Sequence, residues 1–154
     1  MASKSPISVI GLGNRYRSDD GIGLYIADNI KAQNNKRIRV IENISDGAAL
    51  IEAWSEEGRV FVVDAAASDG KPGAIYRFDA LHEKIPADIF ARYSTHSINI
   101  TETIELAITL ERLPESLVIF GVEGPNFASG IGLTPEVEKA AAEVIRMLLC
   151  EVKQ

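Results

Sequence analysis

Cysteine is nearly absent from this chain of 154 residues, which contains only Cys150. A single cysteine excludes a disulfide within the chain, and this shortage is typical of proteins from a reducing compartment. No apolar run is long enough to cross a membrane, because the first run, Ile7–Ile10, is followed at once by glycine. We therefore expect a cytoplasmic protein without a membrane span or a signal peptide.

Positive charge is also in short supply. The formal net charge is -6, and no cluster of Lys or Arg stands out beyond Lys36, Arg37 and Arg39. Such a chain repels phosphate backbones, so we expect no nucleic-acid partner. A composition of 46% hydrophobic residues is enough for one core, and we expect a single domain over residues 1–154, with a monomer as the favoured state.

The signature of a serine hydrolase is missing. The sequence has no Gly-x-Ser-x-Gly segment, and Ser129, in Ala-Ser-Gly, lies in a loop rich in glycine and proline. Asp64 and His96 are available as partners, but without the nucleophile turn the serine hydrolase interpretation is weak.

A nucleotide-binding fingerprint is incomplete. Gly11 and Gly13 begin such a motif, and Glu42 lies at the end of the second expected strand, where a ribose-binding acid would lie. Tyr16 occupies the place of the third glycine, however, and the acid pair Asp19-Asp20 stands where pyrophosphate would bind. Negative charge at that helix start opposes phosphate, which argues against this class.

The segment Gly11–Gly23 is the most informative stretch that the sequence does contain. It follows the apolar run Ile7–Ile10 and precedes apolar residues that recur every four positions, so it predicts a loop between a strand and a helix. Ser18 is a good helix N-cap residue, and the carboxylates of Asp19 and Asp20 suit the partial positive charge of a helix start.

The rest of the chain alternates strand and helix patterns. We expect strands at Ile7–Ile10, Arg37–Asn43, Arg59–Ala67, Ala74–Asp79 and Leu117–Val122. We expect helices at Ile22–Ile30, Ala48–Glu56 and Ser97–Leu110, and a last one with Thr134 as N-cap and Pro135 at its first position. This order predicts an α/β domain of three layers, with a mostly parallel or mixed sheet of about five strands and helices on both faces.

Candidate functional groups follow the expected strands. Asp19-Asp20 comes after the first strand, Asp64 ends the third, and His96 precedes a helix. Ligands of such folds bind beyond the carboxyl ends of the strands, so these groups are expected to share one site. Two carboxylates and an imidazole suit a divalent transition metal, but they could equally serve as an acid and a base without metal.

These residues resemble a known family, the hydrogenase maturation endopeptidases. The resemblance covers nearly the whole chain, and the segments that carry it, in the family's order and at similar spacings, are Gly11-Leu12-Gly13-Asn14, Ser18-Asp19-Asp20-Gly21-Ile22-Gly23, Asp64, His96 and Gly132-Leu133-Thr134-Pro135-Glu136-Val137. It implies a protease that removes a C-terminal extension from the precursor of a nickel-iron hydrogenase large subunit.

The resemblance also implies roles for particular residues. Asp20, Asp64 and His96 match the family's metal and catalytic site. The nickel is expected to arrive already inserted in the precursor, with cadmium or zinc as possible surrogates, so that cleavage depends on metal loading. Substrate recognition falls to Asn14, Asp19 and Asp46. Whether water is activated by the metal or by a carboxylate stays open, so the enzyme is either aspartic-type or metal-assisted.

Two segments depart from the family pattern. Residues 43–47 read Asn-Ile-Ser-Asp-Gly where relatives commonly have an Asp-Gly-Gly-Thr-x-Gly turn, and residues 123–126 contain one residue more than the usual Glu-Pro join. These departures concern which hydrogenase is processed rather than the catalytic trio. The main alternative is a nickel-sensing or nickel-binding module that has the same fold and ligands but no protease activity.

Overall fold

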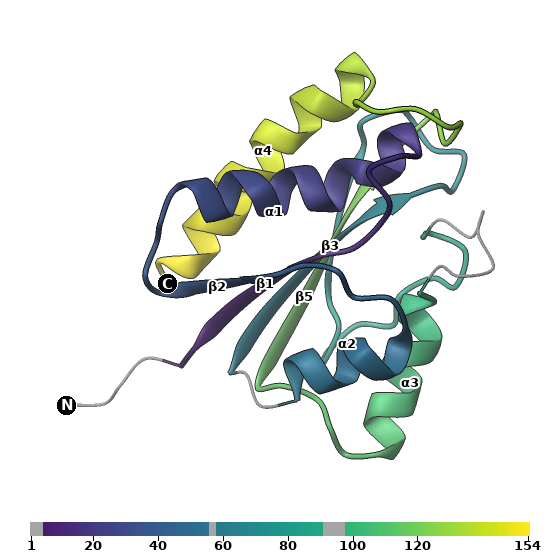
Figure 1. Cartoon of the computed structure of the whole chain (residues 1–154). Coiled ribbons are helices and arrows are strands. Elements are labelled where there is room, and N and C mark those ends of the chain that lie inside the picture. Colours follow the sequence, from purple (N-terminus) through teal and green to yellow (C-terminus); the bar gives the residue numbers. More distant parts are fainter. Residues whose placement is uncertain (1–4, 56–57, 91–97) are drawn as a thin grey trace.

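A five-stranded sheet forms the middle layer of the molecule in the computed structural model, which describes residues 5–55, 58–90 and 98–154 (Figure 1). The strands lie in the order β2-β1-β3-β5-β4. Their bounds are Ile7–Gly11 for β1, Ile38–Ile41 for β2, Arg59–Ala66 for β3, Ile75–Asp79 for β4 and Ser116–Glu123 for β5. β2, β1, β3 and β5 are parallel, and β4 runs antiparallel to β5.

Helices cover both faces of this sheet. On one face lie α1 (Ile22–Ala32), which follows the short 3-10 helix η1 (Ser18–Gly21), and α4 (Pro135–Val152). On the other face lie α2 (Gly47–Trp54) and α3 (Ile100–Thr109), as Figure 1 shows. The predicted α/β architecture, with a mixed sheet between two helical layers, is therefore confirmed. No helix in the described residues is long and apolar enough to cross a membrane.

The central strands are apolar because they contribute to two cores at once. In β3, Phe61 and Val63 pack into the core under α1 and α4, while Val60 and Val62 pack into the core with α2 and α3. Alternate side chains of a strand point to opposite faces, so a strand covered on both sides needs an unbroken apolar run. This explains why the run in the sequence shows no alternation.

Helix α1 begins unusually close to the sheet. A Cβ atom at Gly23 would collide with the carbonyl oxygens of Leu12 and Val63, and one at Gly11 would collide with the carbonyl oxygen of Gly23. The two glycines let the backbone of the helix touch the ends of β1 and β3. The start of α1, and the acid pair before it, is thereby fixed against the sheet.

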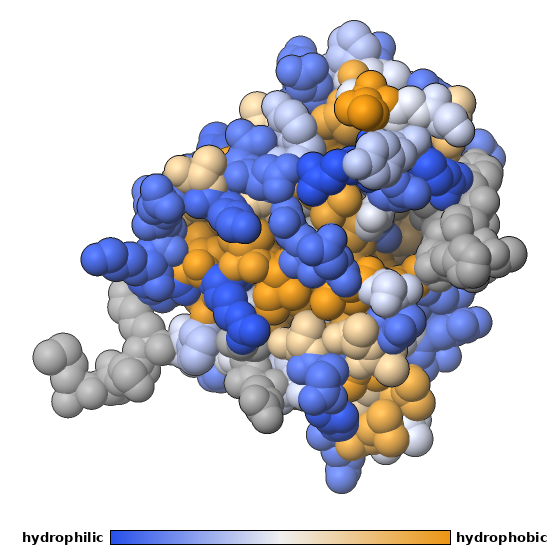
Figure 2. Space-filling model, in the orientation of Figure 1, coloured by the Kyte–Doolittle hydropathy of each residue, from blue (hydrophilic) through white to orange (hydrophobic). Residues whose placement is uncertain are grey.

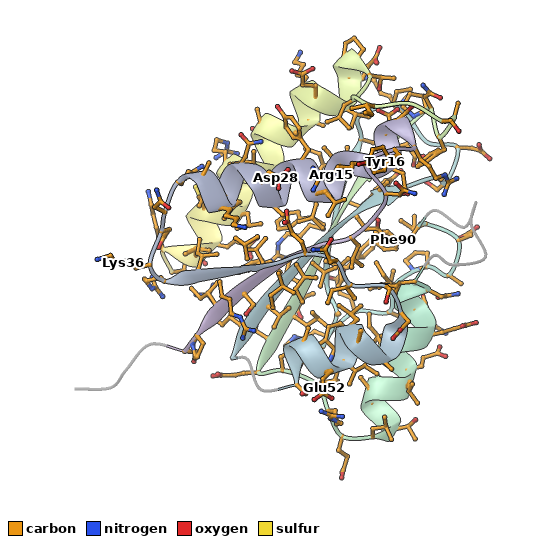
Figure 3. The ribbon with its side chains drawn as sticks, in the orientation of Figure 1. Arg15, Tyr16, Asp28, Lys36, Glu52 and Phe90 are labelled. Carbon is orange, nitrogen blue, oxygen red and sulfur yellow. The ribbon has the colours of Figure 1, made fainter. Side chains whose placement is uncertain are left out.

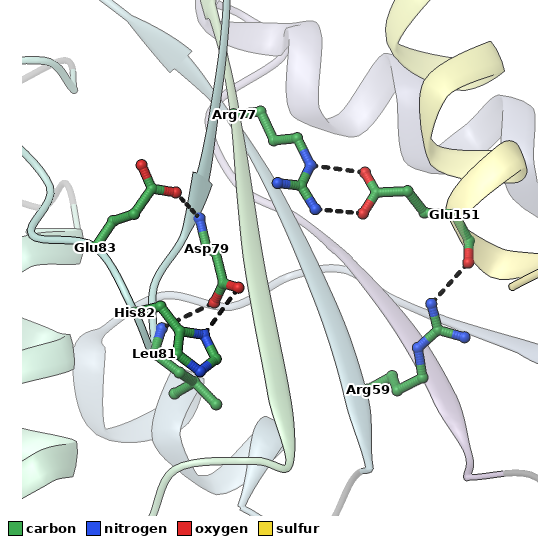
Figure 4. A network of polar contacts seen from close by, with 7 residues as sticks. All are labelled: Arg59, Arg77, Asp79, Leu81, His82, Glu83 and Glu151. Carbon is green, nitrogen blue, oxygen red and sulfur yellow. Dashed lines mark hydrogen bonds and ion pairs between the residues drawn. The ribbon is translucent and has the colours of Figure 1, made fainter.

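The opposite end of the molecule is held by arginines around the last turn of α4 (Figure 4). Arg77 of β4 donates to Glu151 at 2.8 Å, and Arg59 donates to the Glu151 backbone oxygen at 2.7 Å. Arg37 donates to the Val152 backbone oxygen at 3.1 Å. Cations at a helix C-terminus satisfy its free carbonyls and oppose its partial negative charge, so these contacts anchor α4 to the sheet.

Several predicted boundaries need correction. The second strand and second helix are shorter than expected, and the third helix begins at Ile100, after the N-cap Asn99. The prediction that Ser18 caps a helix is wrong. Ser18 lies inside η1 with φ of 53°, and its hydroxyl donates to the Ala128 backbone oxygen at 2.8 Å, a partner 110 residues away.

Candidate functional site

Asp64 lies near the carboxyl end of β3, on the face covered by α2 and α3. Its side chain is buried, and its Oδ1 accepts a hydrogen bond from the Ala65 backbone N–H at 2.8 Å. The neighbouring β1 stops at Gly11, opposite Val63, and the chain then leaves the sheet. β3 continues to Ala66 rather than ending at Asp64, so the carboxylate faces the crevice left where β1 has ended.

Asp20 reaches the same crevice from η1. The Asn14 backbone N–H donates to its Oδ2 at 3.0 Å, and the Arg17 guanidinium lies 3.8 Å from that oxygen. Gly13 makes this turn possible, because it has φ of +119° and a Cβ there would collide with the Asp20 backbone oxygen. The loop between β1 and η1 therefore wraps around Asp20 and fixes its carboxylate.

A cavity of about 370 Å³ contains both carboxylates. Its lining residues are Leu12, Gly13, Asn14, Arg15, Tyr16, Arg17, Asp20, Leu24, Asn43, Ile44, Ser45, Asp64 and Ile98. Burial, helped by the charge of Asp20, raises the pKa of Asp64 to about 8. Burial also raises the pKa of Asp20, although Arg17 and the Asn14 N–H oppose this. The pair thus has a surplus of negative charge that a proton or a cation would relieve.

The donor chemistry of this pair suits a divalent cation. Buried carboxylates with raised pKa values bind cations in exchange for protons, and carboxylate oxygens are ordinary ligands of divalent metals. Within the described ranges no group of three or more His, Cys, Asp and Glu side chains is placed to hold a metal. His96, the predicted third ligand, lies outside the described residues.

The second histidine lies far from this site. His82 follows β4, and its Nδ1 is 2.9 Å from Asp79 Oδ2 (Figure 4). Asp79 is paired with Val118 near the start of β5, because β4 is antiparallel. His82 therefore lies toward the other end of the strands from Asp64 and does not line the cavity, so it cannot complete the predicted site.

Asp19 is wholly buried, at 0% exposure, and its carboxylate is fully used within the protein. Its Oδ2 accepts from the Asn126 N–H at 3.0 Å, and its Oδ1 accepts from the Thr134 N–H at 2.8 Å and the Thr134 hydroxyl at 3.1 Å. The Thr134 side chain makes no capping bond to α4 and serves this acid instead. In this structure Asp19 offers no oxygen to a substrate; it ties the loop 124–134 to the acid motif.

The other two predicted recognition residues lie on the surface. Asn14 is exposed at the cavity, and its Oδ1 accepts from the Tyr16 N–H at 2.9 Å. Asp46 is exposed too, but it caps α2 by accepting from the Ala49 N–H at 2.8 Å and does not line the cavity. Residues 43–45 reach the cavity from that loop instead.

Sequence patterns missed the basic side of the cavity. Arg15 and Arg17 belong to the segment Gly11–Gly23, but they match no motif residue, so nothing in the pattern distinguished them. Arg15 bonds to Asp28 at 2.9 Å, whereas Arg17 lies beside Asp20. The one sequence feature that could have identified them is their spacing of two, on either side of Tyr16, which is exposed in the structure.

The raised pKa of Asp64 predicts that the metal-free protein loses stability as the pH rises. Between its ordinary pKa of 3.8 and about 8, Asp64 keeps its proton in the folded state and loses it in the unfolded state. The folded state then binds more protons, so the free energy of unfolding falls by at most about 1.4 kcal/mol per pH unit. Urea denaturation in EDTA from pH 5 to pH 8 measures this slope. A flat profile in the wild type would contradict the burial of an ionisable Asp64.

Comparison with known proteins places this fold in a family. The model of the HycI hydrogenase maturation proteases matches residues 24–151. The Hydrogenase 2 maturation protease of Escherichia coli is 22% identical, over 96% of this chain and 91% of its own length. A Methanocaldococcus jannaschii protein, named provisionally as a hydrogenase maturation protease, is 26% identical over 98% of this chain and 99% of its own length.

Solved structures agree with this assignment at the level of the fold. The hydrogenase maturating endopeptidase HybD from E. coli superimposes with a TM-score of 0.80 at 22% identity, covering 96% of this chain and 92% of HybD. The family model spans well over half of the chain, from the first turn of α1 to the last turns of α4. The resemblance seen in the sequence is thus confirmed, and the chain belongs to the hydrogenase maturation protease family.

Proposed function

We propose that this protein is an endopeptidase that removes the C-terminal extension of a nickel-iron hydrogenase large-subunit precursor after nickel has been inserted. Family membership supports the activity and the kind of substrate. The observation that carries the proposal is the pair Asp20 and Asp64, whose raised pKa values mark a cavity that favours a cation. We propose that the reaction takes place in the cytoplasm.

The nickel ion is part of the substrate in this proposal. Asp20, Asp64 and His96 complete its coordination when the precursor docks. Its positive charge favours the ionised carboxylates, so Asp64 gives up its proton on docking. Cleavage adds water across the amide: a carboxylate oxygen of this pair that is not bound to the ion accepts a proton from the water, and that proton passes to the leaving amine. A precursor without nickel meets a protonated Asp64 and remains uncut, which makes cleavage conditional on metal loading.

Mass spectrometry of the precursor tests this directly. The large-subunit precursor of the same organism is incubated with the protein, in nickel-loaded and nickel-free forms. We expect a C-terminal peptide to be released only from the loaded form, and Asp88→Asn, a change at an exposed acid outside the cavity, to cleave like wild type. If neither form is cleaved and the protein binds nickel or cadmium, the protease hypothesis would be rejected in favour of a metal-binding module.

A further inference from the structure

Strand β2 is an open edge of the sheet. Among the described residues it pairs with β1 alone, through the register Ile7–Ile10 to Ile38–Ile41. Figure 1 shows it along the front of the molecule, with α1 above and α2 below. The outer side of an edge strand presents a row of backbone N–H and C=O groups that another strand can pair with.

Apolar side chains flank this edge on both faces of the sheet. Ile38 and Val40 are half-buried against the core under α1 and α4, and Ile41 and Ile44 are half-buried against the other core. Figure 2 shows an apolar band across the middle of this face, between hydrophilic regions, where Figure 1 places β2. A strand added here would cover partly exposed apolar surface as well as form backbone hydrogen bonds.

The edge leads directly into the cavity. Asn43, Ile44 and Ser45 follow β2 in the chain and line the same cavity as Asp20 and Asp64. A strand rises about 3.3 Å per residue, so four paired residues along β2 span about 13 Å. A peptide extended along β2 therefore has one end at the rim of this cavity, beside residues 43–45.

The surroundings of β2 are basic although the whole chain is acidic. Lys36 precedes the strand and the exposed Arg39 lies on it, while Arg15 stands above its far end, beside Tyr16 (Figure 3). Lysine and arginine on an edge discourage pairing between copies of the same strand and attract an acidic one.

Two acids also lie on this side, and their charge is compensated locally. Asp28 raises the pKa of Glu42, so this pair of acids holds a proton more readily than two isolated carboxylates would, and Arg15 and Lys31 oppose their negative charge. Arg37, the remaining basic residue of this segment, is occupied with the last turn of α4. The basic side chains named along this edge, Arg15, Lys31, Lys36, Arg37 and Arg39, outnumber these two acids, so the edge has a net attraction for an acidic segment.

We propose that the β2 edge binds an extended, acidic segment of the precursor's C-terminal extension as a sixth strand, and that this pairing delivers the scissile bond to Asp20 and Asp64. The inference rests on the proposed function and adds to it the mode of substrate recognition. It also accounts for a recognition loop that differs from the common family turn, because backbone pairing along β2 does not depend on the side chains of residues 43–47.

Backbone pairing has a signature that side-chain docking lacks. A synthetic peptide with the sequence of the extension is added to the protein, and amide hydrogen exchange is followed residue by residue. We expect protection of β2 amides that exchange freely without the peptide. Peptides carrying an N-methyl group are expected to lose at least tenfold in affinity at alternate positions only, because every second N–H faces β2. Unchanged exchange in β2 with bound peptide overturns the inference.

Charge reversal tests the same surface on the intact precursor. The double variant Lys36→Glu/Arg39→Glu is expected to raise KM at least tenfold at low salt while kcat changes less than twofold. The matched control Lys84→Glu/Lys139→Glu reverses two exposed lysines, one after β4 at the opposite edge and one on α4, and is expected to match wild type. Circular dichroism establishes that both variants fold.

The outcomes separate this inference from the proposed function. Normal cleavage by the β2 variant overturns the docking edge and leaves the protease intact. Failure of the wild type to cleave any precursor overturns the proposed function itself. A concentration-dependent dimer in sedimentation experiments, with protected β2 amides in the absence of peptide, would assign the edge to a second copy of this chain and also overturn the inference.

Discussion

Asp64→Asn is expected to lower precursor cleavage by about 10³-fold or more, and to raise the melting temperature of the metal-free protein at pH 7 to 8. Activity is lost because asparagine can neither take up a proton nor neutralise a cation, and general acid-base catalysis alone contributes about 10²- to 10⁴-fold. Stability is gained because the buried carboxylate beside Asp20 is costly to ionise, as its pKa of about 8 reflects. The gain is of the order of a few kcal/mol at pH 8.

The two effects are measured on the same sample, by mass spectrometry of the precursor and by thermal melting in EDTA. Asparagine retains the oxygen that accepts from the Ala65 N–H, so the local backbone contact survives. Asp88→Asn, at an exposed acid, controls for the charge change and should leave both readings near wild type. Full activity of the Asp64→Asn variant would show that Asp64 has no catalytic role. A lower melting temperature of this variant at pH 8 would contradict the predicted free-energy cost of ionising Asp64 in the folded protein.

Asp19→Ala is expected to destabilise the protein by about 3 to 5 kcal/mol, because several buried donors lose their acceptor at a cost of about 1 to 3 kcal/mol each. The Asn126 and Thr134 N–H groups and the Thr134 hydroxyl would lose their acceptor in a wholly buried place. For a chain of this size the melting temperature should fall by roughly 10 °C or more.

Two further variants make the Asp19 prediction specific. Asp19→Asn keeps one oxygen but presents an NH₂ group to the remaining donors, and we expect it to cost about 1 to 3 kcal/mol. Asp88→Ala, at the surface, should fall within about 0.5 kcal/mol of wild type. Urea denaturation gives the three values. A loss at Asp19→Ala no greater than that at Asp88→Ala would show that the contacts with loop 124–134 contribute nothing to stability.

The architecture could be predicted from the sequence because its signals are local. The unbroken apolar run of β3 predicted a strand buried on both faces, and the proline at the start of α4 predicted where that helix begins. The strand order β2-β1-β3-β5-β4 could not be predicted in this way. Which strands become neighbours depends on packing between distant segments, and the periodicity of a single segment does not indicate its neighbours in the sheet.

The same limit explains the errors at the site. Asp20 and Asp64 were identified because each follows or ends a strand, which is a local property. Ser18 and Asp19 were interpreted as helix-start residues because their local pattern is that of a cap. Their actual partners lie 107 to 115 positions later in the chain, in loop 124–134. Buried long-range hydrogen bonds therefore outweighed the local preference for capping.

The contacts of Asp19 have a consequence for how the protein is made. The acid motif is synthesised early, but the groups that hold it in place, on Asn126 and Thr134, are added more than 100 residues later. At about 5 to 20 residues per second, a ribosome needs roughly 5 to 25 seconds to add them. From the synthesis of Asp64 onward, the nascent chain contains both Asp20 and Asp64 without the loop that fixes Asp19, so the acid motif takes its final form only after loop 124–134 has been made.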